Sequence, residues 1–342
     1  MTHNSNKILF LFTLISGLLI TISSNSWLSA WMGLEINLLS FIPLMSNNDN
    51  IFTTEAALKY FLIQALASSS LLFIIISKSL IESMFTISNS ILNSIMISTP
   101  LLMKSGAAPL HWWFPSVMEG LSWENCFILM TIQKIAPLML ISYSINFNSF
   151  LIVIILMSTL IGAIGGYNQT SIRKILTYSS INHMGWMLTA MLMGENMWML
   201  YFLIYSFLTL TIILIVIPMQ ISFVNQTFLI NENNKMMKFL LFSSLLSLGG
   251  LPPFLGFLPK WMIIQFMMIN WSTTIISTMV ILSLLTLYYY LRITYSAFII
   301  LGIEMSWNTK NDYNSKIMTL SFIFLTISML GLIMTTAFIN IF

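Results

Sequence analysis

The chain has 342 residues, of which 58% are hydrophobic and only 7% are charged. Soluble domains carry about 25% charged residues, so this composition excludes a soluble globular protein, and the high apolar content excludes a disordered chain. The formal net charge of +3 is small and is not gathered into Lys/Arg blocks, which argues against a nucleic-acid partner.

Apolar runs between polar segments predict an all-α polytopic membrane protein. A helix needs about 20 apolar residues to cross a bilayer, and continuous runs such as residues 150–166 lack the alternation of a membrane β-barrel strand. About eleven spans are expected. In chain order they are 7–24, 26–46, 56–77, 88–118, 123–145, 149–167, 172–193, 196–219, 236–270, 273–301 and 317–340.

The fourth and ninth segments are too long for one span and contain Gly and Pro, so we expect discontinuous helices there. Helices five spans apart cross the membrane in opposite directions. This predicts two inverted five-helix repeats, approximately 7–145 and 149–301, with a C-terminal helix over 317–340, all in one membrane domain of residues 1–342. Breaks that fell at these two places by chance are the alternative.

Basic residues in the connections predict the orientation of the chain. Lys78 lies in a loop on the side opposite the N-terminus. The segments on the N-terminal side carry Lys7, Arg173, Lys174, Lys235, Lys238, Lys310 and Lys316. Because positive loops favour the cytoplasm-like compartment, the N-terminus is expected on that side and the C-terminus on the other.

Four charged residues fall inside predicted spans: Glu35, Lys104, Lys134 and Lys260. At mid-bilayer each costs about 2.5–3.5 kcal/mol on insertion scales, or about 10–14 kcal/mol together, which rivals the stability of a typical domain, about 5–15 kcal/mol. Structural ion pairs are one alternative, but three lysines and one glutamate cannot all pair internally. Extension to the membrane interface is a second alternative for Lys260. We expect these residues to translocate protons.

Backbone interruptions adjoin all three lysines. SGAAP follows Lys104, GGLPPFLGFLP precedes Lys260, and Pro137 follows Lys134 and leaves the carbonyl of Gln133 without its helical donor. Within a membrane such breaks persist only where protein or water satisfies the freed backbone groups. Burial disfavours a charged lysine and a nearby carboxylate favours it. A lysine whose surroundings alternate between these states can load and release a proton near neutral pH.

Histidine and cysteine are too sparse for a redox centre. The single cysteine, Cys126, excludes a disulfide within the chain and the four thiolates of an iron–sulfur cluster. The three histidines lack the spacing of a metal site, so no metal and no bound cofactor are expected. His111 and His183 are candidates for a proton relay, with packing as the alternative role.

Six stretches resemble the chain 2 family of mitochondrial NADH–ubiquinone oxidoreductase (respiratory complex I), and they are most similar to its insect members. They are SNSWLSAWMGLEINLLSFIPL, TEAALKYFLIQALASS, LLMKSGAAPLHWWFP, MTIQKIAPLMLISY, GAIGGYNQTSIRKILTYSSINHMGW and LSLGGLPPFLGFLPKWMIIQ. Together they cover most of residues 24–292, whereas the two ends of the chain match only in hydrophobic character.

The resemblance implies an antiporter-like subunit of the membrane arm, built from inverted five-helix repeats. In that family the glutamate of MGLE pairs with the lysine of KSGAAP, which here are Glu35 and Lys104. The lysine of QKIAP, here Lys134, is the central link, and the lysine of LPKW, here Lys260, belongs to the second half-channel.

The resemblance also implies a place in the mitochondrial inner membrane, with the N-terminus in the matrix and the C-terminus in the intermembrane space. The expected partners are other complex I subunits, including neighbouring antiporter-like subunits, and membrane lipids. NADH, FMN, iron–sulfur clusters and ubiquinone are expected on other subunits. The expected function is proton translocation from matrix to intermembrane space, coupled to redox chemistry elsewhere. A cation/proton antiporter subunit and a non-conducting structural subunit are the alternatives.

Overall fold

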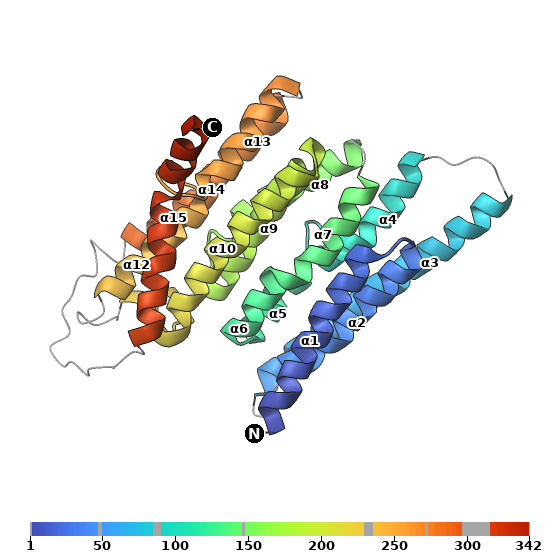
Figure 1. The fold of residues 1–342 in the computed structure, drawn as a ribbon, viewed down its shortest axis with the longest axis horizontal. Coiled ribbons are helices and arrows are strands. Elements are labelled where there is room, and N and C mark those ends of the chain that lie inside the picture. Colours follow the sequence, from blue (N-terminus) through green and yellow to red (C-terminus); the bar gives the residue numbers. More distant parts are fainter. Residues whose placement is uncertain are drawn as a thin grey trace. The chain divides into compact units, whose positions relative to one another are not determined.

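The computed structural model describes residues 2–46, 50–84, 90–145, 148–228, 235–270, 273–295 and 315–341. Over this part of the chain the regular structure is helical (Figure 1), apart from one isolated antiparallel β-bridge between Ser171 and Phe223. The prediction of an all-helical polytopic membrane protein is confirmed. Lys310 and the end of the tenth predicted segment, residues 296–301, lie outside the described residues.

The chain divides into two compact units, residues 1–154 and 155–342. The helices that begin in the N-terminal unit are α1 (Thr2–Ser23), α2 (Trp27–Met45), α3 (Ile51–Met84), α4 (Ser90–Ser105), α5 (Trp113–Gly120), α6 (Trp123–Met130), α7 (Ile132–Ser144) and α8 (Ser149–Gly165). Those of the C-terminal unit are α9 (Ile172–Met193), α10 (Glu195–Met219), α11 (Val224–Phe228), α12 (Lys235–Gly249), α13 (Phe257–Asn270), α14 (Thr273–Tyr295) and α15 (Ser315–Ile341).

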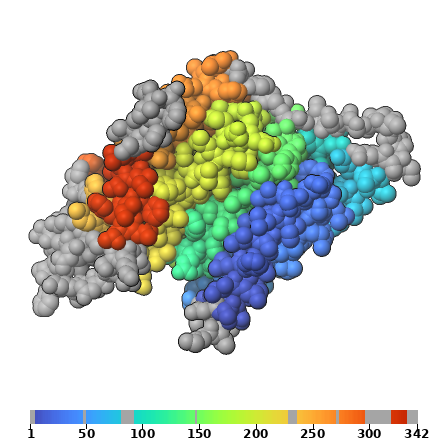
Figure 2. All heavy atoms as spheres, viewed as in Figure 1, coloured from blue at the N-terminus to red at the C-terminus, as the bar shows by residue number. Residues whose placement is uncertain are grey.

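Hydropathy and length support membrane crossing by many of these helices. Six helical segments among the described residues are long and apolar enough to span a bilayer: Ser5–Ser23, Trp27–Met45, Ile51–Leu80, Trp123–Ser144, Glu195–Met219 and Thr273–Tyr295. Shorter apolar helices cover Ser149–Gly165, Met236–Gly249, Phe257–Ile269 and Thr319–Leu332. The outward side of α1, dark blue in Figure 2, carries the exposed apolar residues Ile8, Phe12, Ile15 and Leu19, as expected of a surface that faces lipid.

Several helix bounds differ from the predictions. The fourth and ninth predicted segments are each interrupted, between α4 and α5 and between α12 and α13. The third helix is longer than the predicted 56–77, because polar residues at its two ends continue the helix beyond the apolar stretch. The fifth predicted span, 123–145, agrees with the candidate span Trp123–Ser144, within which Thr131 separates α6 from α7. The short helix α11 was not predicted.

Two glycines bring α1 and α2 close together. A Cβ atom added to Gly33 would lie 2.9 Å from the carbonyl oxygen of Gly17 and 2.6 Å from Cγ2 of Thr21. A Cβ atom added to Gly17 would lie 3.1 Å from the amide nitrogen of Asn37. Small residues let membrane helices approach closely, so this contact positions the part of α2 that carries Glu35 and Asn37.

We expect Gly33→Val to destabilise the protein by about 1–3 kcal/mol, because the added methyl groups overfill the α1–α2 contact. The measurement is the thermal midpoint of the protein extracted in detergent. Met32→Val is the matched control, since Met32 is the neighbouring residue of α2 and is 49% exposed. Equal thermal midpoints for the two variants would contradict the close packing inferred here.

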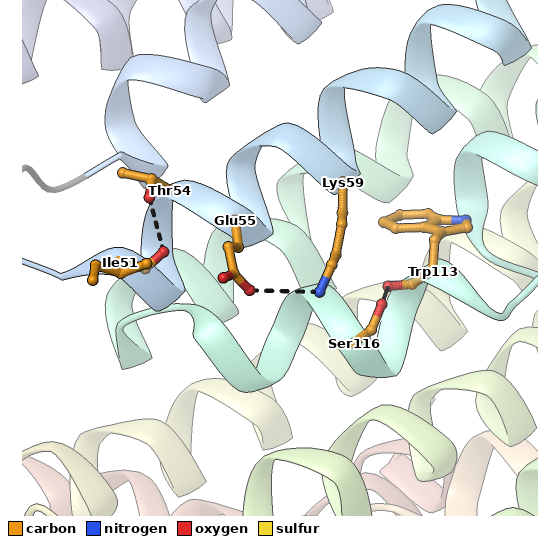
Figure 3. A network of polar contacts seen from close by, with 6 residues as sticks. All are labelled: Ile51, Thr54, Glu55, Lys59, Trp113 and Ser116. Carbon is orange, nitrogen blue, oxygen red and sulfur yellow. Dashed lines mark hydrogen bonds and ion pairs between the residues drawn. The ribbon is translucent and has the colours of Figure 1, made fainter.

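The opposite end of α2 is held by the junction of α5 and α6. The Asn125 side-chain amide donates to the Leu44 carbonyl oxygen at 2.9 Å. A Cβ atom on Gly120 would lie 2.6 Å from the Phe52 carbonyl oxygen, so α5 packs tightly on the start of α3. On the exposed side of α3, an ion pair joins Glu55 Oε2 and Lys59 Nζ at 3.9 Å (Figure 3). A pair of this kind contributes only about 0.2–0.5 kcal/mol.

In the C-terminal unit α9 is buried along most of its length, although it is rich in polar residues. It packs on α10 and α13, while α10 and α14 each pack on α12. Its contact with α8 depends on glycine: a Cβ atom on Gly162 would lie 2.6 Å from the amide nitrogen of Asn182. A buried polar helix of this kind provides side chains for an internal site rather than a lipid-facing surface.

Candidate functional site

Lys104 lies in the last turn of α4, where the helix ends inside the N-terminal unit, and its side chain is 7% exposed. Gly106 terminates the helix with a φ of +74°, a conformation that suits glycine. Side chains from elsewhere satisfy the carbonyls freed by the break. The Trp113 indole donates to the Met103 oxygen at 3.1 Å, and Gln64 Nε2 donates to the Lys104 oxygen at 3.3 Å.

Lys134 lies three residues after a second break. The Thr131 amide and hydroxyl both donate to the Phe127 carbonyl oxygen, at 3.0 and 2.7 Å. A side chain that competes for a backbone acceptor in this way disturbs a helix, and Thr131 accordingly separates α6 from α7. The sequence indicated Pro137 as the local irregularity, yet α7 continues through Pro137. The Lys134 ammonium lies 4.8 Å from the centroid of the Phe114 ring, in a cation–π contact.

Both lysines line one cavity of the N-terminal unit, with about 20 Å³ of space for the centres of water molecules. A water molecule needs about 10–15 Å³ on this measure, together with polar neighbours. The walls include Lys104, Lys134, Asn37, Tyr60, Gln64, Ser105, Phe114 and Gln133. The structure thus brings two of the predicted residues to a place that has room for water.

Hydrogen bonds between side chains organise the wall of this cavity. The Tyr60 hydroxyl donates to Gln133 Oε1 at 3.3 Å, and Gln133 Nε2 donates to Asn37 Oδ1 at 3.0 Å. Asn37 and Tyr60 are buried. None of these three residues was a sequence-based candidate, because uncharged polar residues do not stand out in an apolar span. The proximity of Gln133 to Lys134 in the sequence was the one available signal.

Glu35 lies half-buried on α2 and interacts electrostatically with Lys104. The two side chains do not form an ion pair within 4.0 Å, so Glu35 acts on Lys104 at longer range. His111 lies between α4 and α5, with Nδ1 3.2 Å from the Pro109 carbonyl oxygen and the ring stacked on Trp112. It is buried but is not part of the cavity wall.

Lys260 is buried in the C-terminal unit, on α13. Its ammonium donates to the carbonyl oxygen of Gly249, the last residue of α12, at 2.9 Å. Gly250 has a φ of +83°, and a Cβ atom there would lie 3.1 Å from Lys260 Nζ, so glycine suits this position. Burial and this contact argue against extension of Lys260 to the membrane interface. His183 Nδ1 lies 2.8 Å from the hydroxyl of Tyr201 in the same unit.

Comparison with known proteins assigns the family. The model of the protein family described as "NADH:quinone oxidoreductase/Mrp antiporter, TM" matches residues 24–286, which is most of the chain. The chain belongs to the NADH:quinone oxidoreductase/Mrp antiporter transmembrane family. NADH-ubiquinone oxidoreductase chain 2 of Anopheles gambiae is 56% identical over 332 residues, 96% of each chain. That of Locusta migratoria is 48% identical over 338 residues, covering 99% of this chain and 98% of the relative.

Solved structures support the same fold. A chain of respiratory complex I from Thermus thermophilus has a TM-score of 0.79 at 21% identity, covering 95% of this chain and 78% of that chain. A chain of the Mrp complex from Dietzia has a TM-score of 0.74 at 18% identity, covering 90% of this chain and 62% of that chain. The family resemblance predicted from the six sequence stretches is confirmed.

Proposed function

We propose that this chain is a proton-translocating membrane subunit of NADH:ubiquinone oxidoreductase. Membership of the NADH:quinone oxidoreductase/Mrp antiporter family supports this class of function. The observation that carries the proposal is the cavity that Lys104 and Lys134 share, because it joins two groups able to hold a proton to a space able to hold water. Protons would move from matrix to intermembrane space, driven by redox chemistry in other subunits.

In the proposed cycle Glu35 controls the charge on Lys104. While the carboxylate is near, it stabilises the ammonium of Lys104 in a site where burial opposes charge. When that interaction weakens, Lys104 gives its proton to water in the cavity, and the water gives a proton to Lys134. No covalent bond other than those to hydrogen changes. Lys260 would serve the C-terminal unit in the same way, with His183 as a further relay, and His111 is a weaker candidate.

The proposed placement is the mitochondrial inner membrane, with the N-terminus in the matrix and the C-terminus in the intermembrane space. The chain would cross about eleven times as two inverted five-helix repeats, near 7–145 and 149–301, and a C-terminal helix. The interruptions between α4 and α5 and between α12 and α13 support this arrangement. Neighbouring antiporter-like subunits and lipids would cover its apolar faces, while NADH, FMN, iron–sulfur clusters and ubiquinone would be bound by other subunits.

A cation/proton antiporter subunit is the second candidate, and the likeness to the Mrp fold favours it. The two functions differ in their dependence on sodium. We expect NADH-driven proton translocation by the assembled complex in lipid vesicles to keep its rate when choline replaces Na⁺. A rate that falls without Na⁺, or Na⁺ flux that persists when NADH oxidation is blocked, would favour the antiporter and overturn the proposal.

A further inference from the structure

The C-terminal unit contains buried tyrosines that no sequence pattern singled out. Tyr201 and Tyr205 lie on α10, and Tyr290 lies on α14. All three are 2% exposed or less. A phenylalanine would fill the same volume without the cost of burying a hydroxyl, about 1–3 kcal/mol when it lacks a good partner. Space filling therefore does not explain these three residues.

Two of these tyrosines, Tyr201 and Tyr205, lie beside His183 of α9. The Tyr201 hydroxyl lies 2.8 Å from Nδ1 of His183, which is hydrogen-bonding distance. The His183 ring also lies against Tyr205, with ring centroids 5.2 Å apart. The two tyrosines are four residues apart on α10 and therefore present their side chains on one face of that helix.

A second set of interactions joins α10 to α14. Tyr205 interacts electrostatically with Tyr290 and also interacts with Ser180 of α9, whose hydroxyl donates to the Thr177 carbonyl oxygen at 2.7 Å. Ser179, the preceding residue of α9, interacts in the same way with Tyr290, and its hydroxyl donates to the Leu176 carbonyl oxygen at 2.8 Å. Hydroxyl groups from three helices are thus gathered in one buried region.

A further set of contacts reaches Lys260. A Cβ atom on Gly249 would lie 3.4 Å from Cδ2 of the Tyr290 ring, so the end of α12 touches that ring. The carbonyl oxygen of the same glycine accepts a hydrogen bond from Lys260 Nζ at 2.9 Å. The interactions therefore lead from His183 to Tyr201 and Tyr205 on α10, and from Tyr205 to Tyr290 on α14. Gly249, at the end of α12, connects the Tyr290 ring with Lys260 within the same compact unit.

Buried polar atoms of α9 and α10, the helices that carry His183, Tyr201 and Tyr205, indicate internal water in this part of the unit. Asn182 Oδ1, Trp186 Nε1 and Trp198 Nε1 are buried and make no hydrogen bond to another described residue. Buried polar groups of folded proteins have partners in the great majority of cases, and internal water supplies them where protein does not. Asn182 and Trp186 lie one residue before and three residues after His183 on α9, and Trp198 lies on α10, the helix that carries Tyr201 and Tyr205. Water bound at these atoms would lie on the same two helices.

We propose that Tyr201, Tyr205 and Tyr290, completed by water and by the hydroxyls of Ser179 and Ser180, relay protons between His183 and Lys260. The inference rests on the proposed function. Each hydroxyl accepts a proton from the neighbour on one side while it gives its own to the neighbour on the other. One proton enters and one leaves, no group is oxidised or reduced, and rotation of the hydroxyls restores the starting state. A tyrosine need not hold a net charge between transfers.

The test compares Tyr205→Phe and Tyr290→Phe in the assembled complex, because each removes one hydroxyl and keeps the ring. We expect either change to lower NADH-driven proton translocation at least about fivefold, since positioned proton-transfer groups contribute about 10²–10⁴-fold. The solvent deuterium isotope effect on translocation should increase. The double variant should fall little further than the single ones, because one gap already interrupts the relay.

Tyr178→Phe is the matched control. Tyr178 also lies on α9, but its ring packs on Gly165 of α8, so removal of its hydroxyl should leave rate and isotope effect unchanged. Wild-type rates and isotope effects in both Tyr205→Phe and Tyr290→Phe overturn the relay. If Lys134→Met is defective in the same assay, the proposed function survives that result, whereas three unaffected variants would overturn both.

Discussion

Replacing Lys134 by methionine is expected to lower NADH-driven proton translocation by the assembled complex at least about tenfold, since positioned proton-transfer groups contribute about 10²–10⁴-fold. Methionine fills a similar volume but holds no proton. The variant should still assemble, because a well-packed apolar residue in place of a buried charge is often neutral or stabilising. The measurement is proton uptake into vesicles that contain the complex, alongside the rate of NADH oxidation.

Two further variants separate proton transfer from charge. Lys134→Arg keeps a positive charge but cannot release a proton near neutral pH, so it should be as defective as Lys134→Met. Lys59→Met on the exposed side of α3 removes a lysine that takes no part in the cavity, and it should behave as the wild type. Full activity of Lys134→Arg would mean that this site needs a fixed charge rather than a mobile proton.

Glu35→Gln is expected to reduce proton translocation by about three- to thirtyfold. The change removes the carboxylate charge and keeps the size of the side chain. Two unit charges about 8 Å apart interact by about 2 kcal/mol when the effective dielectric constant is about 20, which corresponds to about thirtyfold and sets the upper end of this range. Translocation and NADH oxidation in the assembled complex are again the measured quantities.

The electrostatic link to Lys104 makes a more specific test of the same residue. If Glu35 acts through Lys104, the combination of Glu35→Gln with Lys104→Met should be no worse than Lys104→Met alone, which is a non-additive result. Glu55→Gln, at the exposed ion pair of α3 (Figure 3), is the control and should have little effect. Multiplicative losses in the double variant would show that Glu35 and Lys104 act independently.

Charge was the feature of the sequence that located the lysines. Lys104, Lys134 and Lys260 stand out because a lysine in an apolar span is costly, and all three are buried in the structure. The interruptions between α4 and α5 and between α12 and α13 were also predictable, because Gly and Pro within an apolar run indicate a break in the helix. In both respects the bilayer limits the number of structures that the sequence can adopt.

The remaining features depend on which helices meet. Gln133 is polar in the sequence, but only the packing of α2, α3 and α7 places it between Tyr60 and Asn37. Within the predicted span 123–145, the Thr131 hydroxyl competes for one backbone carbonyl oxygen, and this local irregularity between α6 and α7 is not visible in the apolar periodicity. Nothing in the sequence distinguishes the tyrosines of α10 from the other aromatic residues of apolar spans, and only the packing of α9 on α10 places them beside His183.

The central claim is that protons move through the buried lysines of this chain. Its most direct test is the number of protons translocated per NADH oxidised, together with the rate, for Lys104→Met and Lys134→Met in the assembled complex reconstituted in sealed vesicles. Both variants are expected to lose proton flux relative to Lys59→Met, through a lower ratio, a lower rate or both. Wild-type ratio and rate in both variants would contradict it.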